Sequence, residues 1–274
     1  MSVTDGHCSS LNALPSDIIR RMIRAGITSM DEMKLISPRW NNLAHEHLSD
    51  RTRLPVMERC WFHFHSTQTE IRINIPRPFY KYFGVHIWLA GYCPTTRSTD
   101  YRRFLKTQCI LNGTGKAVEQ LNQIFARCSK IGNLVLEVGL TDRALITAVK
   151  NAVGPVKIGE LSVKGELFTN YDNEKVLDFV RFNDVNVLVL STFTIDCVQT
   201  FDTFFIEAAL YATKVQFTQR EMISVRHDLN AIRNDWERAS NWLNETGQVS
   251  AVLDEEMESE VGYVQMRITM IKSH

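Results

Sequence analysis

The segment "IGNLVLEV", residues 131–138, has apolar residues at its first, fourth and sixth positions. Three later segments share this pattern: "IGELSVKG" from Ile158, "VNVLVLST" from Val185 and "ATKVQFTQ" from Ala212. The four starting positions, 131, 158, 185 and 212, are 27 residues apart each time. A constant spacing of this size indicates a repeating unit that packs against its neighbours along the chain.

Helix-like segments separate these strands at residues 142–152, 173–181 and 201–211, and they keep the same spacing. The pattern resembles a leucine-rich repeat, although no Asn or Cys follows the strands where that family places one. The predicted fold class is α+β or α/β. Residues 55–274 are expected to form a short leucine-rich-repeat-like β/α solenoid with repeats near residues 131, 158, 185 and 212.

The end of the chain departs from the repeat. Residues 228–245 have the apolar spacing of an amphipathic helix. The acidic run in residues 248–260 predicts a solvated loop. Residues 261–271 alternate apolar and polar side chains, which predicts a final strand that covers the open end of the solenoid.

Shorter strands are predicted before the repeats. Residues 60–65 and 70–75 alternate well enough to pair as a hairpin, and residues 82–92 predict a more deeply buried strand. A short strand at residues 109–111 is expected to lead through a tight turn, residues 112–116, into a helix.

Two histidines, His63 and His65, share one face of the first of these strands, with Cys60 nearby. Histidine and cysteine are zinc ligands, but a site needs a third or fourth ligand at suitable geometry, and none is recognisable in the sequence. The histidines are therefore predicted to be half-exposed strand residues, with no metal and no cofactor bound.

Residues 11–50 predict three short helices. Pro15 suits the first turn of a helix, and Gly26 suits its end. Ser29 starts a capping box that opens a second helix, and Ser37 can cap a third. A unit of this size is rarely stable alone, so its surplus apolar residues are expected to face the rest of the chain or the groove of another protein.

These residues resemble the F-box motif in order and spacing: Leu14-Pro15, Asp17-Ile18-Ile19, Ile23, Met33, Leu35-Ile36, Ser37, Arg39-Trp40 and Leu43. The resemblance implies a three-helix F-box-like module, residues 11–50, that binds the Skp-family adaptor of a cullin–RING ubiquitin ligase. The residues implied in that binding are Leu14, Pro15, Ile18, Ile19, Ile23, Met33, Ile36 and Trp40.

Composition excludes several other functions. The 274-residue chain has 31 basic and 31 acidic residues, a balance that suggests neither nucleic acid nor an anionic membrane as partner. No apolar run reaches the roughly 18 residues needed to cross a bilayer. The six cysteines contain no CxxC pair and are expected to be free thiols, as in the reducing cytosol or nucleus.

The predicted function combines the two patterns. No common catalytic motif is found in the sequence, so the chain is not expected to be an enzyme. It is expected to be the substrate-recognition adaptor of an SCF-type ubiquitin ligase, with residues 55–274 binding a target protein of unknown identity. The alternative is an interaction scaffold outside the ligase, with the N-terminal helices packed on the repeat domain.

Overall fold

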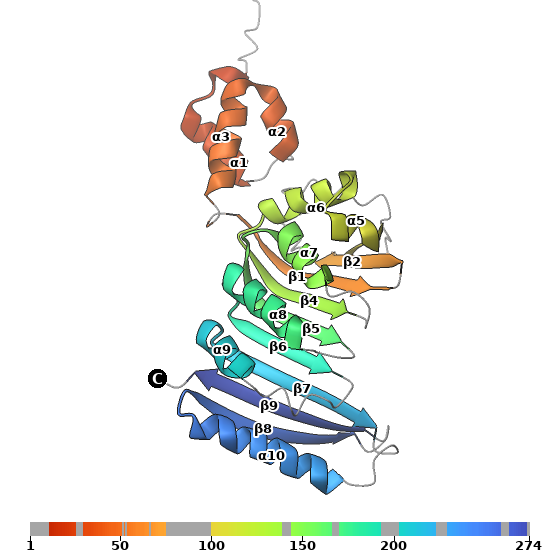
Figure 1. Cartoon of the computed structure of the whole chain (residues 1–274). Helices are drawn as coiled ribbons and strands as arrows, with labels where there is room; N and C mark the ends of the chain where they lie inside the picture. Colours follow the sequence, from red (N-terminus) through yellow and green to blue (C-terminus); the bar gives the residue numbers. More distant parts are fainter. Residues whose placement is uncertain are drawn as a thin grey trace, which may run out of the picture.

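The computed structural model describes residues 11–25, 30–50, 52, 54–65, 67–74, 100–138, 144–165, 170–192, 203–222, 229–258 and 263–272. The described elements form one broad sheet, a layer of helices on one of its faces, and a group of three helices beyond one end of the sheet (Figure 1).

The strands of the sheet are β1 Val56–Phe64, β2 Gln68–Asn74, β3 Asp100–Lys106, β4 Lys130–Val138, β5 Lys157–Gly165, β6 Val187–Thr192, β7 Lys214–Met222, β8 Val249–Glu258 and β9 Tyr263–Lys272. Their order across the nine-stranded sheet is β3-β2-β1-β4-β5-β6-β7-β9-β8. The five adjacent strands β1, β4, β5, β6 and β7 are parallel to one another. Antiparallel strands extend the sheet at both ends.

The predicted fold class, a three-helix F-box-like module followed by a short leucine-rich-repeat-like solenoid, is wrong. The chain builds a nine-stranded mixed α/β sheet, because β2 and β3 on one side and β9 and β8 on the other extend the parallel strands. The 27-residue spacing is present as strand register: Leu134 pairs with Leu161, and Leu161 pairs with Leu188. The spacing identifies the parallel βα units but carries no information about the strands added at the ends.

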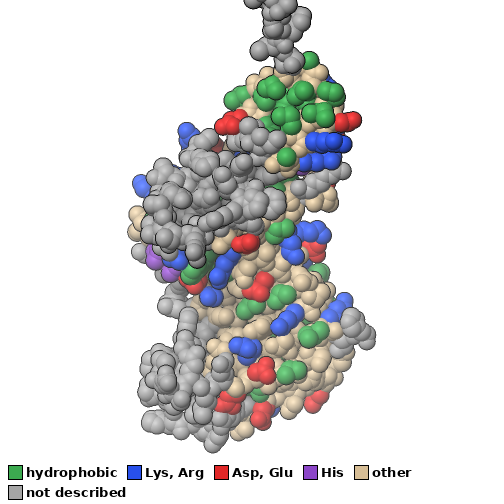
Figure 2. Space-filling view, turned by 180° about the vertical axis from the view of Figure 1, so that it is seen from behind, with side chains coloured by type: hydrophobic (Ala, Val, Ile, Leu, Met, Phe, Trp, Pro, Cys, Tyr) green, Lys and Arg blue, Asp and Glu red, His purple; other side chains and the backbone are tan. Residues whose placement is uncertain are grey.

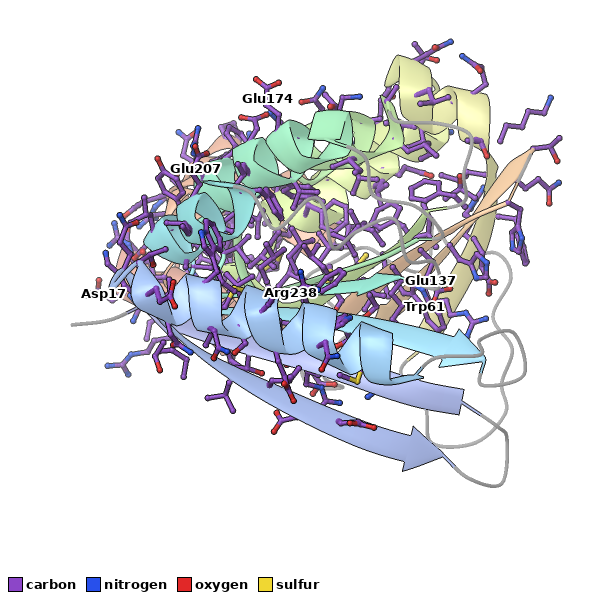
Figure 3. All side chains as sticks on the ribbon, turned by 60° about the horizontal axis from the view of Figure 1, so that its bottom comes forward. Asp17, Trp61, Glu137, Glu174, Glu207 and Arg238 are labelled. Atoms are coloured by element: carbon purple, nitrogen blue, oxygen red, sulfur yellow. The ribbon has the colours of Figure 1, made fainter. Side chains whose placement is uncertain are left out.

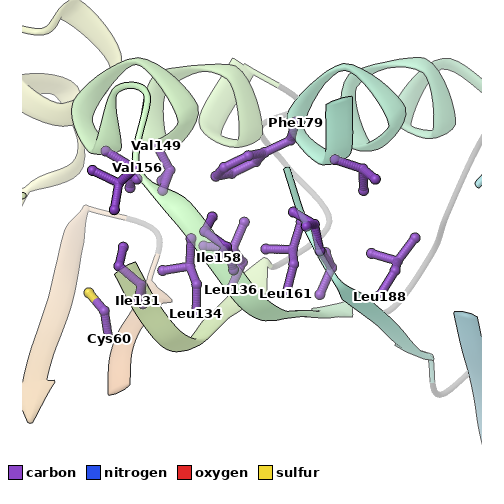
Figure 4. Packing of buried hydrophobic residues seen from close by; sticks show 14 of the residues in the cluster. Cys60, Ile131, Leu134, Leu136, Val149, Val156, Ile158, Leu161, Phe179 and Leu188 are labelled. Atoms are coloured by element: carbon purple, nitrogen blue, oxygen red, sulfur yellow. The ribbon is translucent and has the colours of Figure 1, made fainter. Parts of the chain in front are cut away.

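Helices cover one face of this sheet (Figure 1): α5 Thr107–Asn112, α6 Lys116–Ala126, α7 Ala144–Val153, α8 Asn170–Phe182, α9 Thr203–Tyr211 and α10 Leu229–Glu245. The core lies between the two layers, where Leu134, Leu136 and Leu161 from the strands meet Val149 and Phe179 from the helices (Figure 4). Burial of this apolar layer supplies the main stabilisation of the sheet.

Two glycines permit close approach of neighbouring strands. A Cβ on Gly132 would lie 2.6 Å from the carbonyl oxygen of Glu58, and a Cβ on Gly159 would lie 2.6 Å from that of Gly132. Each glycine follows the first apolar residue of the repeated pattern. In both repeats the glycine and the residue after it are only partly buried, and the next residue, Leu134 or Leu161, is buried again.

The helix predictions in the repeats are confirmed by α7, α8 and α9, and the hairpin is confirmed by the pairing of Cys60 with Ile73. The final strand is confirmed by β9. The predicted loop at residues 248–260 is wrong, because Val249–Glu258 forms β8 beside β9. The predicted strand at residues 109–111 is also wrong, since those residues lie within α5.

The predicted strand at residues 82–92 lies outside the described residues. Among the helices that the structure describes, none has both the length and the apolar character needed to cross a membrane.

The N-terminal helices are α1 Ser16–Ala25, α2 Met30–Ile36 and α3 Pro38–Ser49, preceded by a 3₁₀ turn at Leu11–Ala13. Gly26 and Ser29, the residues predicted to end the first helix and to cap the second, lie outside the described residues. The Ser37 side chain accepts a hydrogen bond from the Trp40 backbone N–H, which confirms the predicted cap of α3.

Candidate functional site

The first candidate surface is carried by α1, α2 and α3. Of the eight residues expected to bind an adaptor, four form the core of this helical group: Ile19, Ile23, Met33 and Trp40 are at most 1% exposed. The Trp40 indole Nε1–H donates a hydrogen bond to the carbonyl oxygen of Leu11 at 3.3 Å, which ties the 3₁₀ turn to α3. These four residues hold the helices together and are not accessible to a partner.

The other four residues lie at or near the surface of the helical group. Pro15 and Ile18 are exposed, while Leu14 and Ile36 are half-buried. Leu35 is 86% exposed, which makes it the most exposed large apolar side chain of the described residues. Leu35 belongs to the motif but was not among the predicted binding residues, because the exposure of a side chain is not visible in the pattern.

Apolar side chains gather on the outer face of this helical group, as the cluster at the top of Figure 2 shows. Leu11, in the 3₁₀ turn before α1, is a further exposed apolar residue, at 50%, and was not predicted. Scattered exposed apolar residues are normal on proteins, but a gathered set of them on so small a unit is typical of an interaction site.

Polar contacts fix the arrangement of α1 against α3. Arg20 in α1 forms an ion pair with Glu46 in α3, with 3.2 Å between Nη2 and Oε2. Arg39 in α3 donates a hydrogen bond from Nη2 to the Ser16 hydroxyl at 2.6 Å. The helical group therefore presents its apolar surface from a fixed frame.

A hollow of about 150 Å³ lies beside this ion pair, lined by Arg20, Ile23, Arg24, Leu43, Glu46, His47 and Asp50. Pockets that take drug-sized molecules are usually about 300–1,000 Å³. The hollow is too small for such a ligand.

The second candidate surface lies on the face of the sheet that the helices leave open. Trp61, His63 and His65 point to this face along β1 and just beyond it, and their rings form a continuous stack. The His63 and His65 ring centroids are 4.3 Å apart. The Arg72 guanidinium lies 4.6 Å from the Trp61 ring centroid, within range of a cation–π interaction.

Carboxylates from two neighbouring strands complete this surface. Glu137 in β4 lies 3.0 Å from His63, measured between Oε2 and Nδ1. Glu70 in β2 lies opposite His63 in the antiparallel pairing and is hydrogen-bonded by Arg72, with 2.7 Å between Nε and Oε1. Figure 3 shows Trp61 and Glu137 close together on the strands, and Figure 2 shows histidine side chains grouped at the margin of this face.

Cys60 does not join the histidines. It points into the core on the opposite face of β1 and is 0% exposed. Burial raises the pKa of the Cys60 thiol well above its ordinary value, and the nearby Cys128 raises it further. The structure therefore separates the three residues that the sequence places together, and it brings Glu70 to the histidines in place of Cys60.

Comparisons with known proteins assign no family to the chain. No protein-family model matches it, and no curated protein matches it. Among solved structures, a fibrillarin pre-rRNA processing protein of Methanococcus jannaschii is similar to 79% of this chain over 99% of its own, at 11% identity and a TM-score of 0.25.

An uncharacterized protein from Listeria monocytogenes serotype 4b is similar to 59% of this chain over 69% of its own, at 13% identity and a TM-score of 0.20. TM-scores this low do not establish a shared fold. The function of the chain therefore has to be inferred from the two surfaces themselves.

Proposed function

We propose that the chain is a substrate-recognition adaptor of an SCF-type cullin–RING ubiquitin ligase, and that α1–α3 bind a Skp-family adaptor. The observation that carries the proposal is the exposure of Leu35, 86%, on helices whose interior is already filled by Ile19, Ile23, Met33 and Trp40. An amphipathic helix surface of this kind is typically buried in the apolar groove of a partner.

The residues at this surface have the chemistry that such binding needs. Leu35 and Ile18 are large aliphatic side chains at exposed helix positions, and Pro15 lies exposed just before α1. Burying one Leu or Ile side chain contributes about 1.5–3 kcal/mol. A few such side chains in one interface are enough to anchor a complex, since binding energy concentrates in a small number of residues.

In this proposal the chain makes and breaks no bonds itself. The part of the chain from residue 55 onwards binds the target, while α1–α3 bind the adaptor and, through it, the cullin. Holding both at once makes the encounter of target and ligase intramolecular, which raises the effective concentration of the target. The proposal requires no cofactor, nucleic acid or membrane.

The test is capture of a purified Skp-family adaptor by the purified full chain. We expect the wild type to bind, and the double variant Ile18→Asp plus Leu35→Asp to bind at least about tenfold more weakly, because both charges would have to be buried. Leu210→Asp is the matched control, since Leu210 is 49% exposed on α9, away from the proposed interface.

Two results would count against the proposal. One is a folded wild-type chain that captures no adaptor, which would favour a scaffold function outside the ligase. The other is equal loss of capture in the Leu210→Asp control, which would show that the charge acts on folding. Circular dichroism and thermal unfolding of each variant separate these two results.

A further inference from the structure

Two histidines and a carboxylate meet next to the turn of the β1–β2 hairpin. His63 in β1 lies directly opposite Glu70 in β2, so both side chains project to the same face of the sheet. His65 follows two residues after His63 on that face, and its backbone N–H donates to the Gln68 carbonyl oxygen at 2.9 Å. The hairpin itself therefore fixes the relative positions of the three residues.

The potential ligand atoms of these residues are close together. One ring nitrogen from each histidine and one carboxylate oxygen of Glu70 all lie within 4.8 Å of one another. Around a zinc ion, with bonds of about 2.0–2.2 Å, neighbouring ligand atoms lie about 3.3 Å apart. His65 is exposed at the end of the strand, so rotation of its side chain can bring its ring nitrogen most of the way to the shorter separation that zinc requires.

The residues around this cluster have the positions expected of supporting groups. The Glu137 carboxylate, 3.0 Å from His63 Nδ1, can accept that N–H and leave the ring lone pair on Nε2. Metal-binding histidines are usually held in this way by a carboxylate. Arg72 donates to both carboxylate oxygens of Glu70, at 2.7 and 3.2 Å, and fixes the orientation of the carboxylate.

We propose that His63, His65 and Glu70 bind a divalent transition-metal ion such as Zn²⁺. Two imidazoles and a carboxylate are ligands that suit zinc, and a three-ligand site keeps an open coordination position. That position would face away from the helices, where a water or a carboxylate of a bound partner can occupy it. The site does not depend on the proposed ligase function, because it lies on the sheet and not on α1–α3.

The site is missed in the sequence because Glu70 joins the histidines only through strand pairing. Cys60, the third candidate by sequence distance, points to the core on the other face of β1. Successive strand residues project to opposite faces, so a neighbour in sequence is often not a neighbour in the site.

The proposal is tested by titrating the purified full chain with Zn²⁺ by calorimetry and with Co²⁺ by visible absorption. We expect one equivalent to bind to the wild type. His65→Ala and Glu70→Gln are expected to weaken binding at least about tenfold, and Glu137→Gln about 10-fold to 100-fold, as loss of a supporting carboxylate usually does. His45→Ala, which removes an exposed histidine of α3, is expected to change nothing.

The proposal is overturned if the folded wild type binds neither ion. It is equally overturned if His65→Ala binds as tightly as the wild type, because the ion would then be held by other surface histidines. His65 is exposed, so its replacement is not expected to disturb folding. Thermal unfolding gives a second readout: Zn²⁺ should raise the melting temperature of the wild type but not that of His65→Ala.

Discussion

Trp40 is the side chain on which the helical group depends most. It is 1% exposed, and its indole N–H is bonded to the Leu11 carbonyl oxygen. Trp40→Ala leaves a large cavity between short helices, and a loss of about 3–5 kcal/mol is expected. In Trp40→Ala, hydrogen exchange should become faster than in the wild type in α1–α3 but not in the sheet.

The comparison for Trp40→Ala is Arg39→Ala at the neighbouring, exposed position. Arg39→Ala removes a surface hydrogen bond to Ser16 and should change stability by less than about 1 kcal/mol. Equal exchange rates in the two variants would contradict a structural role for Trp40.

Gly159 matters because it has no Cβ, which lets β5 lie close to β4. In Gly159→Ala the new Cβ would lie 2.6 Å from the Gly132 carbonyl oxygen, so β4 and β5 would have to shift apart. We expect a loss of about 1–3 kcal/mol, as for other overpacked sites. Urea unfolding measures it, with the exposed Ser250→Ala in β8 as a control that should change little.

Cys60 is expected to lower the free energy of unfolding at alkaline pH. Burial, with a further contribution from Cys128, raises the pKa of its thiol in the folded chain. In the unfolded chain the thiol loses its proton near its ordinary pKa of about 8.5. Above that pH the folded state binds more protons than the unfolded state, so this contribution to stability is complete below pH 8.5 and falls as pH rises.

The measurement is the free energy of unfolding from pH 7 to pH 10 for the wild type and for Cys60→Ala. The variant is less stable throughout, but its stability should fall less steeply above pH 8.5. Parallel curves for the two proteins would show that Cys60 carries no such dependence.

At the scale of elements, β8 is held at the end of the sheet partly by a side chain from α10. Asn244 donates to the Ala251 carbonyl oxygen at 2.9 Å and accepts from the Ala251 N–H at 2.8 Å. Asn244 thus bonds the side of the strand that faces away from β9. Asn244→Ala should cost about 1–3 kcal/mol and raise hydrogen exchange at Ala251. Asn241→Ala, at an exposed position of the same helix, should do neither.

The prediction of a loop at β8 was wrong for a physical reason. The run that includes Asp254 and Glu255 has the composition of a solvated loop, yet acidic side chains also suit a strand at the edge of a sheet, where they oppose pairing with other chains. The short apolar run at residues 109–111 is ambiguous in the same way. Short apolar runs do not distinguish a strand from a helix, and these residues lie in α5.

Local chemistry made other elements predictable. Ser37 and Pro38 define the start of α3 without help from the rest of the chain. Asn183 shows the limit of such reasoning. Its amide nitrogen donates to the carbonyl oxygens of Gly154 and Val156, each more than 25 residues away in the sequence. A buried amide that joins neighbouring repeats has no local pattern and was not predicted.

At the scale of the whole molecule, the 27-residue spacing predicted the parallel strands but not the architecture. Parallel strands in sequence order, each followed by a helix, occur both in solenoids and in open sheets. The two architectures differ in what lies beside the outermost parallel strands. Here β2 pairs with β1 and β9 pairs with β7, and both added strands come from segments outside the repeat. The surface that we propose for adaptor binding was only partly predictable as well, because the pattern does not separate buried Ile19 from exposed Ile18.

The two proposed sites lie in different parts of the molecule. Leu35 belongs to α2, beyond one end of the sheet (Figure 1). His65 follows the last residue of β1, whereas α3 precedes the first residue of that strand. Substitutions at distant sites without shared contacts act independently. We therefore expect Leu35→Asp to weaken adaptor capture while leaving Zn²⁺ affinity unchanged, and His65→Ala to do the reverse.

Both affinities should be measured on both variants and on the double variant, whose two losses should equal those of the single variants within about twofold, or roughly 0.4 kcal/mol. Loss of metal binding in Leu35→Asp would mean that the charge unfolds the chain or that the surfaces are coupled, and hydrogen exchange of the sheet distinguishes these. Loss of adaptor binding in His65→Ala would indicate that the adaptor also contacts the open face of the sheet.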